Sequence, residues 1–292
     1  ALGIGEDYNV KVNSSLQRIS FMRKIVILGG GYGGITVVHE LLRARLPDEW
    51  YITLIDRLPF QGLKTEFYAL AAGTVSDYEL RVPFPADARV VILHGEIAGI
   101  DTRSRLVIVQ NREPVAYDLL VVALGCVDRY HGIPGAREHT CSIQTFSSCR
   151  ETYRQINDVK PYGQVTIVGG GLSGVEVAAE LRESRPDLNI RILDRGASVL
   201  SSFPRKARDY VQSWFLEHDV EMRGHVGITR VEPGRLYNGD EIIETDVSVW
   251  TAGIQAHPLA QSLPGEKDGI GRVVLTAEHH LPGDDTVYVV GD

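Results

Sequence analysis

The sequence of 292 residues predicts an α/β protein of two three-layer units, each with a parallel sheet and an antiparallel β-meander as crossover. The first observation is a repeated pattern, in which an apolar strand runs into the turn G-x-G-x-x-G and then into an amphipathic helix. The turn spans Gly29–Gly34 in the first copy and Gly169–Gly174 in the second. The second observation is that a further apolar strand follows each helix and ends in an aspartate, Asp56 or Asp194. These features are typical of Rossmann-like nucleotide-binding units.

The composition excludes several classes of protein. Hydrophobic residues make up 43% and charged residues 23% of the chain, as in an ordinary globular protein, and the length suits about two domains. The net charge is −8 and no basic run occurs, which argues against nucleic-acid binding. No apolar stretch approaches the roughly 20 residues of a membrane-spanning helix.

The cysteines and the first residues indicate the cellular setting. Cys126, Cys141 and Cys149 lack C-x-x-C spacing, so we expect neither a disulfide framework nor a metal site. We expect a reducing, cytoplasmic location instead. Residues Ala1–Phe21 are polar, lack the apolar core of a signal peptide and precede Met22. We expect them to be a disordered or vector-derived extension.

The first unit is expected to run from strand to helix to strand. Apolar residues at Ile35, Val38 and Leu41 follow the helical period. The expected elements are strand Ile25–Leu28, helix Gly33–Ala44, strand Ile52–Ile55, a loop Arg57–Gly73, a buried strand Val90–His94, a meander over Ala98–Asp101, Leu106–Gln110 and Val115–Tyr117, and a buried strand Leu119–Leu124.

The second unit repeats this order. A partly helical crossover is expected over residues 134–160, before a second strand–helix–strand motif from Gln164 to Asp194. The remaining expected elements are helix Pro204–His218 and the strands Val220–Met222, Ile228–Val231, Val247–Trp250, Arg272–Leu275 and Val287–Val290.

The glycines of the turn have separate physical roles. The first allows a sharp turn out of the strand, the second lets a pyrophosphate approach the backbone, and the third lets the helix pack on the strand. The helix N-terminus offers unpaired N–H groups to the phosphates, and the aspartate binds the ribose of the adenosine. The glycines are Gly29, Gly31 and Gly34 in the first turn and Gly169, Gly171 and Gly174 in the second. Two turns predict two dinucleotides, with electrons passing between them.

Three further segments resemble the two-dinucleotide-binding-domain flavoproteins, which combine FAD with NAD(P)H. They are Tyr117–Gly125, Val249–Gly253 and Thr286–Asp292, each a strand followed by a turn. The resemblance implies that FAD binds the first turn with Asp56, Ala123, Gly125 and Asp292, and that NADH binds the second with Asp194 and Gly253. It also implies an FAD-binding domain over residues 22–130 and 256–292, incomplete without the C-terminal domain of that superfamily, and an NAD(H)-binding domain over residues 131–255.

Within this superfamily the chain looks most like a type II NADH:quinone oxidoreductase. The resemblance rests on Ala69–Thr74, Trp250–Ile254 and Gly174–Glu176. It implies that Glu176 lies where nicotinamide and flavin meet, a catalytic role that the first turn lacks, since Thr36 stands at the matching position. The competing interpretation is an ordinary, partly buried glutamate near a helix N-terminus.

A second catalytic candidate lies in the loop before the small-residue run. Lys64 and Glu66 are expected near the flavin ring, where Lys64 would stabilise negative charge on the reduced flavin. A surface ion pair between the two is the competing interpretation.

The cysteines help to separate related enzymes. Arg57–Gly73 contains no cysteine, which argues against a thiol relay of the disulfide-reductase type. Cys126 follows the Ala123–Gly125 turn and keeps a sulfide:quinone oxidoreductase open, although a buried structural thiol is the default. A ferredoxin-type reductase and a non-catalytic nucleotide-sensing flavoprotein also stay open.

The resemblance therefore implies hydride transfer from NADH to flavin and electron transfer to a quinone. Asp194 favours NADH because a carboxylate repels a 2′-phosphate, whereas the neighbouring Arg195 could attract one. A homodimer is expected, with peripheral contact at the inner face of the cell membrane through residues after Asp292.

Overall fold

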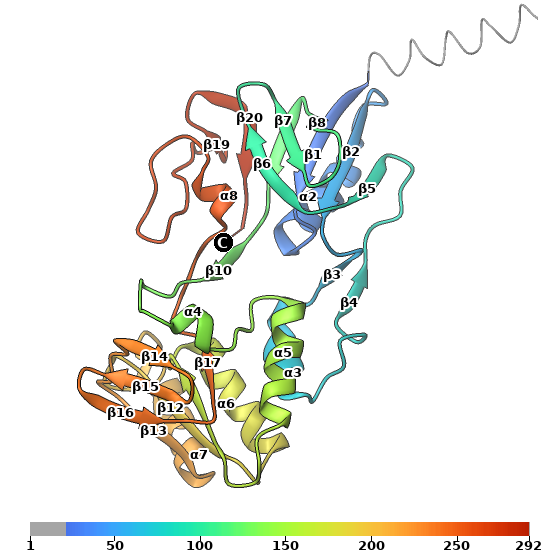
Figure 1. Cartoon of the computed structure of the whole chain (residues 1–292). Helices are drawn as coiled ribbons and strands as arrows, with labels where there is room; N and C mark the ends of the chain where they lie inside the picture. The colour runs from blue at the N-terminus through green and yellow to red at the C-terminus, as the bar shows by residue number, and fades with distance from the viewer. Residues whose placement is uncertain (1–21, 292) are drawn as a thin grey trace, which may run out of the picture. The chain divides into compact units, whose positions relative to one another are not determined.

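A computed structural model describes residues 22–291, which fall into two compact units (Figure 1). The first unit contains residues up to Gln61, then Val82–Gly125, and the part that starts at Ala256. The second contains Gly62–Arg81 and Cys126–Gln255. The expected extension Ala1–Phe21 and the expected flavin ligand Asp292 lie outside the described residues.

The first unit is built on a six-stranded sheet with the order β19-β20-β9-β1-β2-β5. Five of its strands are parallel, and β19 pairs antiparallel with β20. The strands are β1 (Arg23–Leu28), β2 (Trp50–Asp56), β5 (Val90–His94), β9 (Leu119–Val122), β19 (His280–Leu281) and β20 (Asp284–Val289). The expected strand at Arg272–Leu275 is wrong, because Val273 makes only an isolated bridge to Lys267.

Alternate residues of β1 bury on opposite faces of this sheet, which gives the expected three layers. Ile25 and Ile27 pack with α2 (Tyr32–Arg43) on one face. Val26 and Leu28 pack with the meander on the other. The meander consists of β6 (Ile97–Asp101), β7 (Leu106–Val109) and β8 (Val115–Ala116), and the short helix α8 (Pro258–Gln261) adds Ala260 to the same core.

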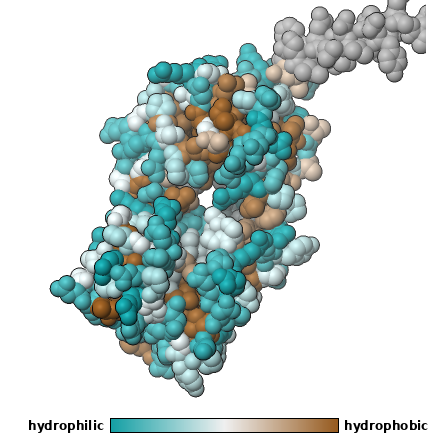
Figure 2. All heavy atoms as spheres, viewed as in Figure 1, coloured by the Kyte–Doolittle hydropathy of each residue, from teal (hydrophilic) through white to brown (hydrophobic). Residues whose placement is uncertain are grey.

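The edge strand β5 exists as expected but is not buried. Val91 is 51% exposed and Ile92 is 38% exposed on this edge strand, which pairs with β2 alone. Figure 2 shows hydrophobic residues set among hydrophilic ones on the visible face of both units. The apolar sequence therefore predicted the position of this strand correctly, but the prediction that the strand is buried is wrong.

The second unit has a four-stranded parallel sheet with the order β13-β12-β11-β17. Val168, Leu193 and Trp250 of this sheet bury against the antiparallel meander β14-β15-β16. Helix α6 packs against β11 and β12, and α7 packs against β13. The bounds are β11 (Gln164–Val168), α6 (Leu172–Ser184), β12 (Asn189–Leu193), α7 (Arg205–Glu217), β13 (Val220–Arg223), β14 (Arg230–Glu232), β15 (Arg235–Asn238), β16 (Glu241–Glu244) and β17 (Val247–Trp250). The α/β class, with two parallel sheets and two meanders, is confirmed.

The expected loop Arg57–Gly73 contains a 3-10 turn, η1 (Lys64–Glu66), and a helix, α3 (Phe67–Ala72). The helix ends at Gly73, whose φ of 79° is the left-handed conformation that favours glycine, and this small-residue run before a glycine was a usable sequence signal. The contacts of α3 place residues 62–81 in the second unit, whereas the FAD-binding domain expected over residues 22–130 included them.

Those contacts lie along α5 (Phe146–Asn157) and α6, which Figure 1 shows beside α3. The rings of Phe67 and Phe146 meet edge to face with centroids 4.9 Å apart. The Thr74 hydroxyl donates a hydrogen bond to the Glu180 carboxylate of α6. Burial of this aromatic pair favours packing of the segment in the second unit, although its neighbours in the sequence belong to the first unit.

Short strand pairs lie where the chain passes from one unit to the other. They are β3 (Phe60–Gly62) with β4 (Arg81–Pro83), and β10 (Cys126–Asp128) with β18 (Ile254–Ala256). The remaining helix is α4 (Ala136–His139). Every helix within residues 22–291 is too short or too polar to span a lipid bilayer.

Candidate functional site

The two glycine-rich turns have the same backbone geometry. Gly29 and Gly169 leave their strands with φ of 97° and 114°, a region that side chains disfavour. A Cβ on Gly34 would lie 1.9 Å from the Gly29 carbonyl oxygen, and a Cβ on Gly174 would lie 1.9 Å from that of Gly169. No side chain fits in either place, so close helix–strand packing explains the third glycine of each turn.

The middle glycine of each turn faces open space. A Cβ on Gly31 or on Gly171 would meet no atom within 4 Å. Each is the N-cap of its helix, α2 or α6, and neither receives a side-chain cap. The two helix N-termini thus lack a side-chain cap at the glycine, a geometry that fits the pyrophosphates of two dinucleotides.

The two strand-end aspartates bind their own turns in the same way. Asp56 Oδ2 accepts the N–H of Gly30 at 2.6 Å, and Asp194 Oδ2 accepts the N–H of Gly170 at 2.6 Å. The other oxygen of each accepts an N–H two residues further on, from Leu58 at 2.7 Å and from Gly196 at 2.6 Å. A carboxylate has about four acceptor positions, so each can still accept ribose hydroxyls. The sequence did not reveal this bracing role.

Two of the expected flavin contacts lie beside the first turn. A Cβ on Gly29 would lie 2.4 Å from the Ala123 carbonyl oxygen, so the two backbones are in close contact. Gly125 has φ of 67°, and its carbonyl accepts the N–H of His257 at 3.0 Å. The structure thus brings Ala123 close to the turn and places Gly125 two residues beyond it.

Gly253 occupies the corresponding place in the second unit. The Thr251–Ala252 backbone lies against Gly169, where a Cβ would be 2.7 Å from the Thr251 carbonyl oxygen. Gly253 follows with φ of 128°, and His131 Nε2 lies 2.9 Å from the Ala252 carbonyl oxygen. His131 had no sequence signal, because its contact depends on the pairing of β10 with β18.

Glu176 lies two residues after Gly174, in the first turns of α6. Burial raises the pKa of Glu176, and the Glu66 carboxylate raises it further. The Tyr68 hydroxyl donates to Glu66 Oε2 at 3.1 Å, and burial raises the Tyr68 pKa, with Glu66 next in effect. The structure therefore joins Tyr68 to Glu66 and brings Glu66 within electrostatic range of Glu176, and Tyr68 is a residue that sequence reasoning missed.

Lys64 contacts a cysteine instead of forming a surface ion pair with Glu66. Its Nζ donates to Cys126 Sγ at 3.3 Å, and Cys126 Sγ lies 3.8 Å from Gln144 Oε1. Cys126 is only partly buried, so the full burial expected in its default interpretation as a structural thiol is wrong. Cys141 and Cys149 are buried, and burial raises the pKa of these thiols to about 11 and about 12.

A small cavity of about 190 Å³ opens beside Asp194 in the second unit. Its lining includes Val199, Gln212 of α7 and the last residues of β13, Met222 and Arg223. It lies at the carboxyl ends of β12 and β13, where open α/β sheets bind ligands. The position suits the adenosine half of a dinucleotide whose pyrophosphate lies on α6.

The comparisons with known proteins agree with this geometry. A family model described as pyridine nucleotide-disulphide oxidoreductase matches residues 23–292. NADH dehydrogenase-like protein YutJ of Bacillus subtilis is 53% identical over 271 residues, which cover 93% of this chain and 76% of that protein. A type II NADH:quinone oxidoreductase of Staphylococcus haemolyticus is 25% identical over 300 residues, which cover 92% and 74%.

Two solved structures share the fold. The NDH2 structure from Plasmodium falciparum in complex with NADH has a TM-score of 0.79 and 17% identity, covering 92% of this chain and 64% of that one. The sulfide:quinone oxidoreductase of Aquifex aeolicus has a TM-score of 0.77 and 20% identity, covering 92% and 68%. The chain belongs to the pyridine nucleotide-disulphide oxidoreductase family and is a pyridine-nucleotide-dependent flavoprotein oxidoreductase.

Proposed function

We propose that this protein is an FAD-dependent NADH dehydrogenase that passes electrons to a quinone. The observation that carries the proposal is the second turn, which combines available N–H groups, the braced Asp194 and, two residues after Gly174, a glutamate of raised pKa. The likeness to an NADH dehydrogenase-like protein at 53% identity supports it. Bound FAD would accept the hydride of NADH and pass the two electrons on to the quinone.

The residues of the second unit bind and orient the nicotinamide dinucleotide. The first N–H groups of α6 hold the pyrophosphate, which Gly171 admits because no side chain covers the backbone there. Asp194 accepts ribose hydroxyls and repels a 2′-phosphate, which favours NADH over NADPH. Arg195 is exposed, so its side chain can lie in solvent.

The residues of the first unit are proposed to hold the flavin nucleotide, with Gly29, Gly31 and Gly34 on its pyrophosphate, Asp56 on its ribose, and Ala123 and Gly125 beside it. Asp292 is proposed to complete this site. The proposed FAD-binding domain is thus residues 22–130 and 256–292 without residues 62–81, which pack in the second unit, and residues 131–255 form the proposed NAD(H)-binding domain.

Glu176 and Lys64 are the proposed catalytic residues. A carboxyl group with a raised pKa remains protonated up to a higher pH than an ordinary one. Glu176 can therefore donate a proton to a reduced acceptor. The Lys64 ammonium supplies positive charge that stabilises an anion near it. We propose a cytoplasmic homodimer with peripheral membrane contact as the cellular form.

Stopped-flow reduction of the flavin tests the proposal. NADH should bleach the flavin absorbance faster than NADPH, and NADH:menadione turnover should follow. Nucleotide binding without turnover would instead support a nucleotide sensor, and equal reduction by NADPH would refute the NADH preference.

The contact between Lys64 and Cys126 favours a second candidate, a sulfide:quinone oxidoreductase. Cys126 Sγ is partly exposed and lies 3.3 Å from the Lys64 ammonium, and it would form an S–S bond with sulfide if bound flavin took the two electrons that this bond formation releases. Sulfide should then bleach the flavin, and Cys126→Ser should abolish that bleaching while Cys149→Ser leaves it intact. No bleaching by sulfide in the parent protein would exclude this candidate.

A further inference from the structure

The end of β13 carries an arginine beside the ribose aspartate of the second unit. Arg223 pairs in register with Leu193, and its carbonyl accepts the N–H of Asp194 at 3.0 Å. Arg223 and Asp194 both line the cavity at the carboxyl ends of β12 and β13. In enzymes that use NADPH, an arginine near this aspartate binds the 2′-phosphate. Arg223 therefore stands where a guanidinium would confer NADPH binding.

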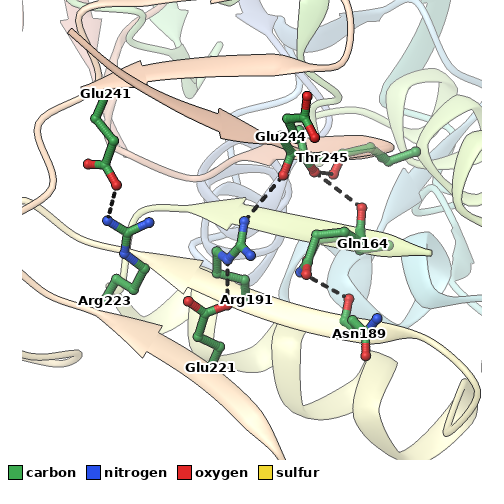
Figure 3. A network of polar contacts seen from close by, with 10 residues as sticks. Gln164, Asn189, Arg191, Glu221, Arg223, Glu241, Glu244 and Thr245 are labelled. Atoms are coloured by element: carbon green, nitrogen blue, oxygen red, sulfur yellow. Dashed lines mark hydrogen bonds and ion pairs between the residues drawn. The ribbon is translucent and has the colours of Figure 1, made fainter. Parts of the chain in front are cut away.

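The Arg223 side chain is engaged elsewhere. Its Nη2 donates to Glu241 Oε1 at 2.6 Å, and the two side chains point toward each other in Figure 3. Glu241 lies on the meander strand β16, and its other oxygen accepts Nδ2 of Asn238 at 3.0 Å. The hydrogen bonds from Asn238 and from Arg223 lower the pKa of Glu241, so this carboxylate stays charged at neutral pH.

We propose that Glu241 determines nucleotide specificity by holding Arg223 away from the 2′ position of the ribose, so that NADP(H) finds no cation there. The inference rests on the proposed dinucleotide site of the second unit. A 2′-phosphate meets the negative charge of Asp194, while the guanidinium of Arg223 is already paired with Glu241. The site for the adenosine half of the dinucleotide thus disfavours NADPH in two ways. Asp194 repels the 2′-phosphate, and Arg223 is not free to bind it.

The same network provides a matched control. Arg191, on β12, donates to Glu221 at 2.5 Å and to the Glu244 carbonyl at 3.3 Å. Figure 3 shows this pair next to that of Arg223 and Glu241. Arg191 does not line the cavity beside Asp194. Removing the charge of Glu221 therefore perturbs the same surface without freeing an arginine near the ribose.

Isothermal titration of the full-length protein with NAD⁺ and with NADP⁺ tests the inference. Glu241→Gln should raise the affinity for NADP⁺ relative to NAD⁺ by about tenfold, the gain of one charge-assisted hydrogen bond. Glu221→Gln should leave the ratio unchanged, and Arg223→Ala in the Glu241→Gln background should remove the gain.

The outcomes separate this inference from the proposed function. If the parent protein binds NAD⁺ and Glu241→Gln leaves the ratio as it was, or if Glu221→Gln changes it equally, Glu241 has no part in specificity. If no variant binds either nucleotide, the proposed function and this inference are both refuted. Circular dichroism of each variant checks that the second unit remains folded.

Discussion

Replacing Gly171 and Gly174 separately by alanine tests whether the second turn is built for a pyrophosphate. The Gly171 backbone is extended, with φ of −73°, and a Cβ there meets no atom within 4 Å. Gly171→Ala should thus change the free energy of unfolding by less than about 1 kcal/mol, the scale of an N-cap substitution. A Cβ at Gly174 instead overlaps the Gly169 carbonyl oxygen at 1.9 Å. That overlap should cost about 3 kcal/mol.

Gly174→Ala should mainly lower stability, whereas Gly171→Ala should mainly lower the affinity for NADH. Gly174→Ala should lower the thermal midpoint by roughly 6–12 °C, at 2–4 °C per kcal/mol for a chain of this size. Gly171→Ala should unfold near the parent midpoint but bind NADH about tenfold to hundredfold more weakly, because a methyl group separates the phosphate from an N–H. Differential scanning fluorimetry and NADH titration measure both quantities. A folded Gly171→Ala protein with parent affinity for NADH would refute the reasoning.

Three further predictions concern single side chains. The raised pKa of Glu176 means that the folded protein binds this proton more tightly than the unfolded chain, so stability falls as pH rises from the unfolded pKa through the raised folded pKa. Glu176→Gln should flatten that slope in urea unfolding, and an unchanged slope would contradict the assignment. Iodoacetamide should label Cys126 before Cys141 and Cys149, as followed by mass spectrometry of peptides, because the latter two are buried with raised pKa values; labelling of Cys149 first would be inconsistent with this burial. Thr145→Ala should lower the free energy of unfolding by about 1 kcal/mol by removing the capping box of α5, while NADH affinity stays the same. A loss of NADH affinity as well as stability would contradict the expectation that α5 lies apart from the proposed nucleotide site.

Local chemistry made the turns predictable. Glycine-rich turns, apolar strands and a terminal aspartate follow from short-range sterics and periodicity, so the pattern around Gly29 and Gly169 could be read directly. The helix α3 was missed because six small and apolar residues give little periodicity, and because it packs against residues far away in the sequence, such as Phe146. The same limit applies to Val273, where an apolar run bridges one residue instead of joining a sheet.

The site shows the same division. Asp194 was predictable from its place after a strand, but the pairing of Arg223 with Glu241 depends on how β16 folds back toward β13. The effect of Glu66 on the pKa of Glu176 depends on the packing of residues 62–81 against α6. Contacts between residues distant in the chain carry no local pattern, and they are what the structure adds.

The bracing of each glycine turn by its aspartate limits how nucleotide preference can change. Asp194 accepts two backbone N–H groups, so an exchange of this residue for a neutral or basic one would loosen the glycine-rich turn along with the proposed ribose contact. A switch of coenzyme by that single step would sacrifice binding of both nucleotides. Variation at Glu241 leaves the turn untouched, which makes it the more accessible route for evolution or engineering toward NADPH.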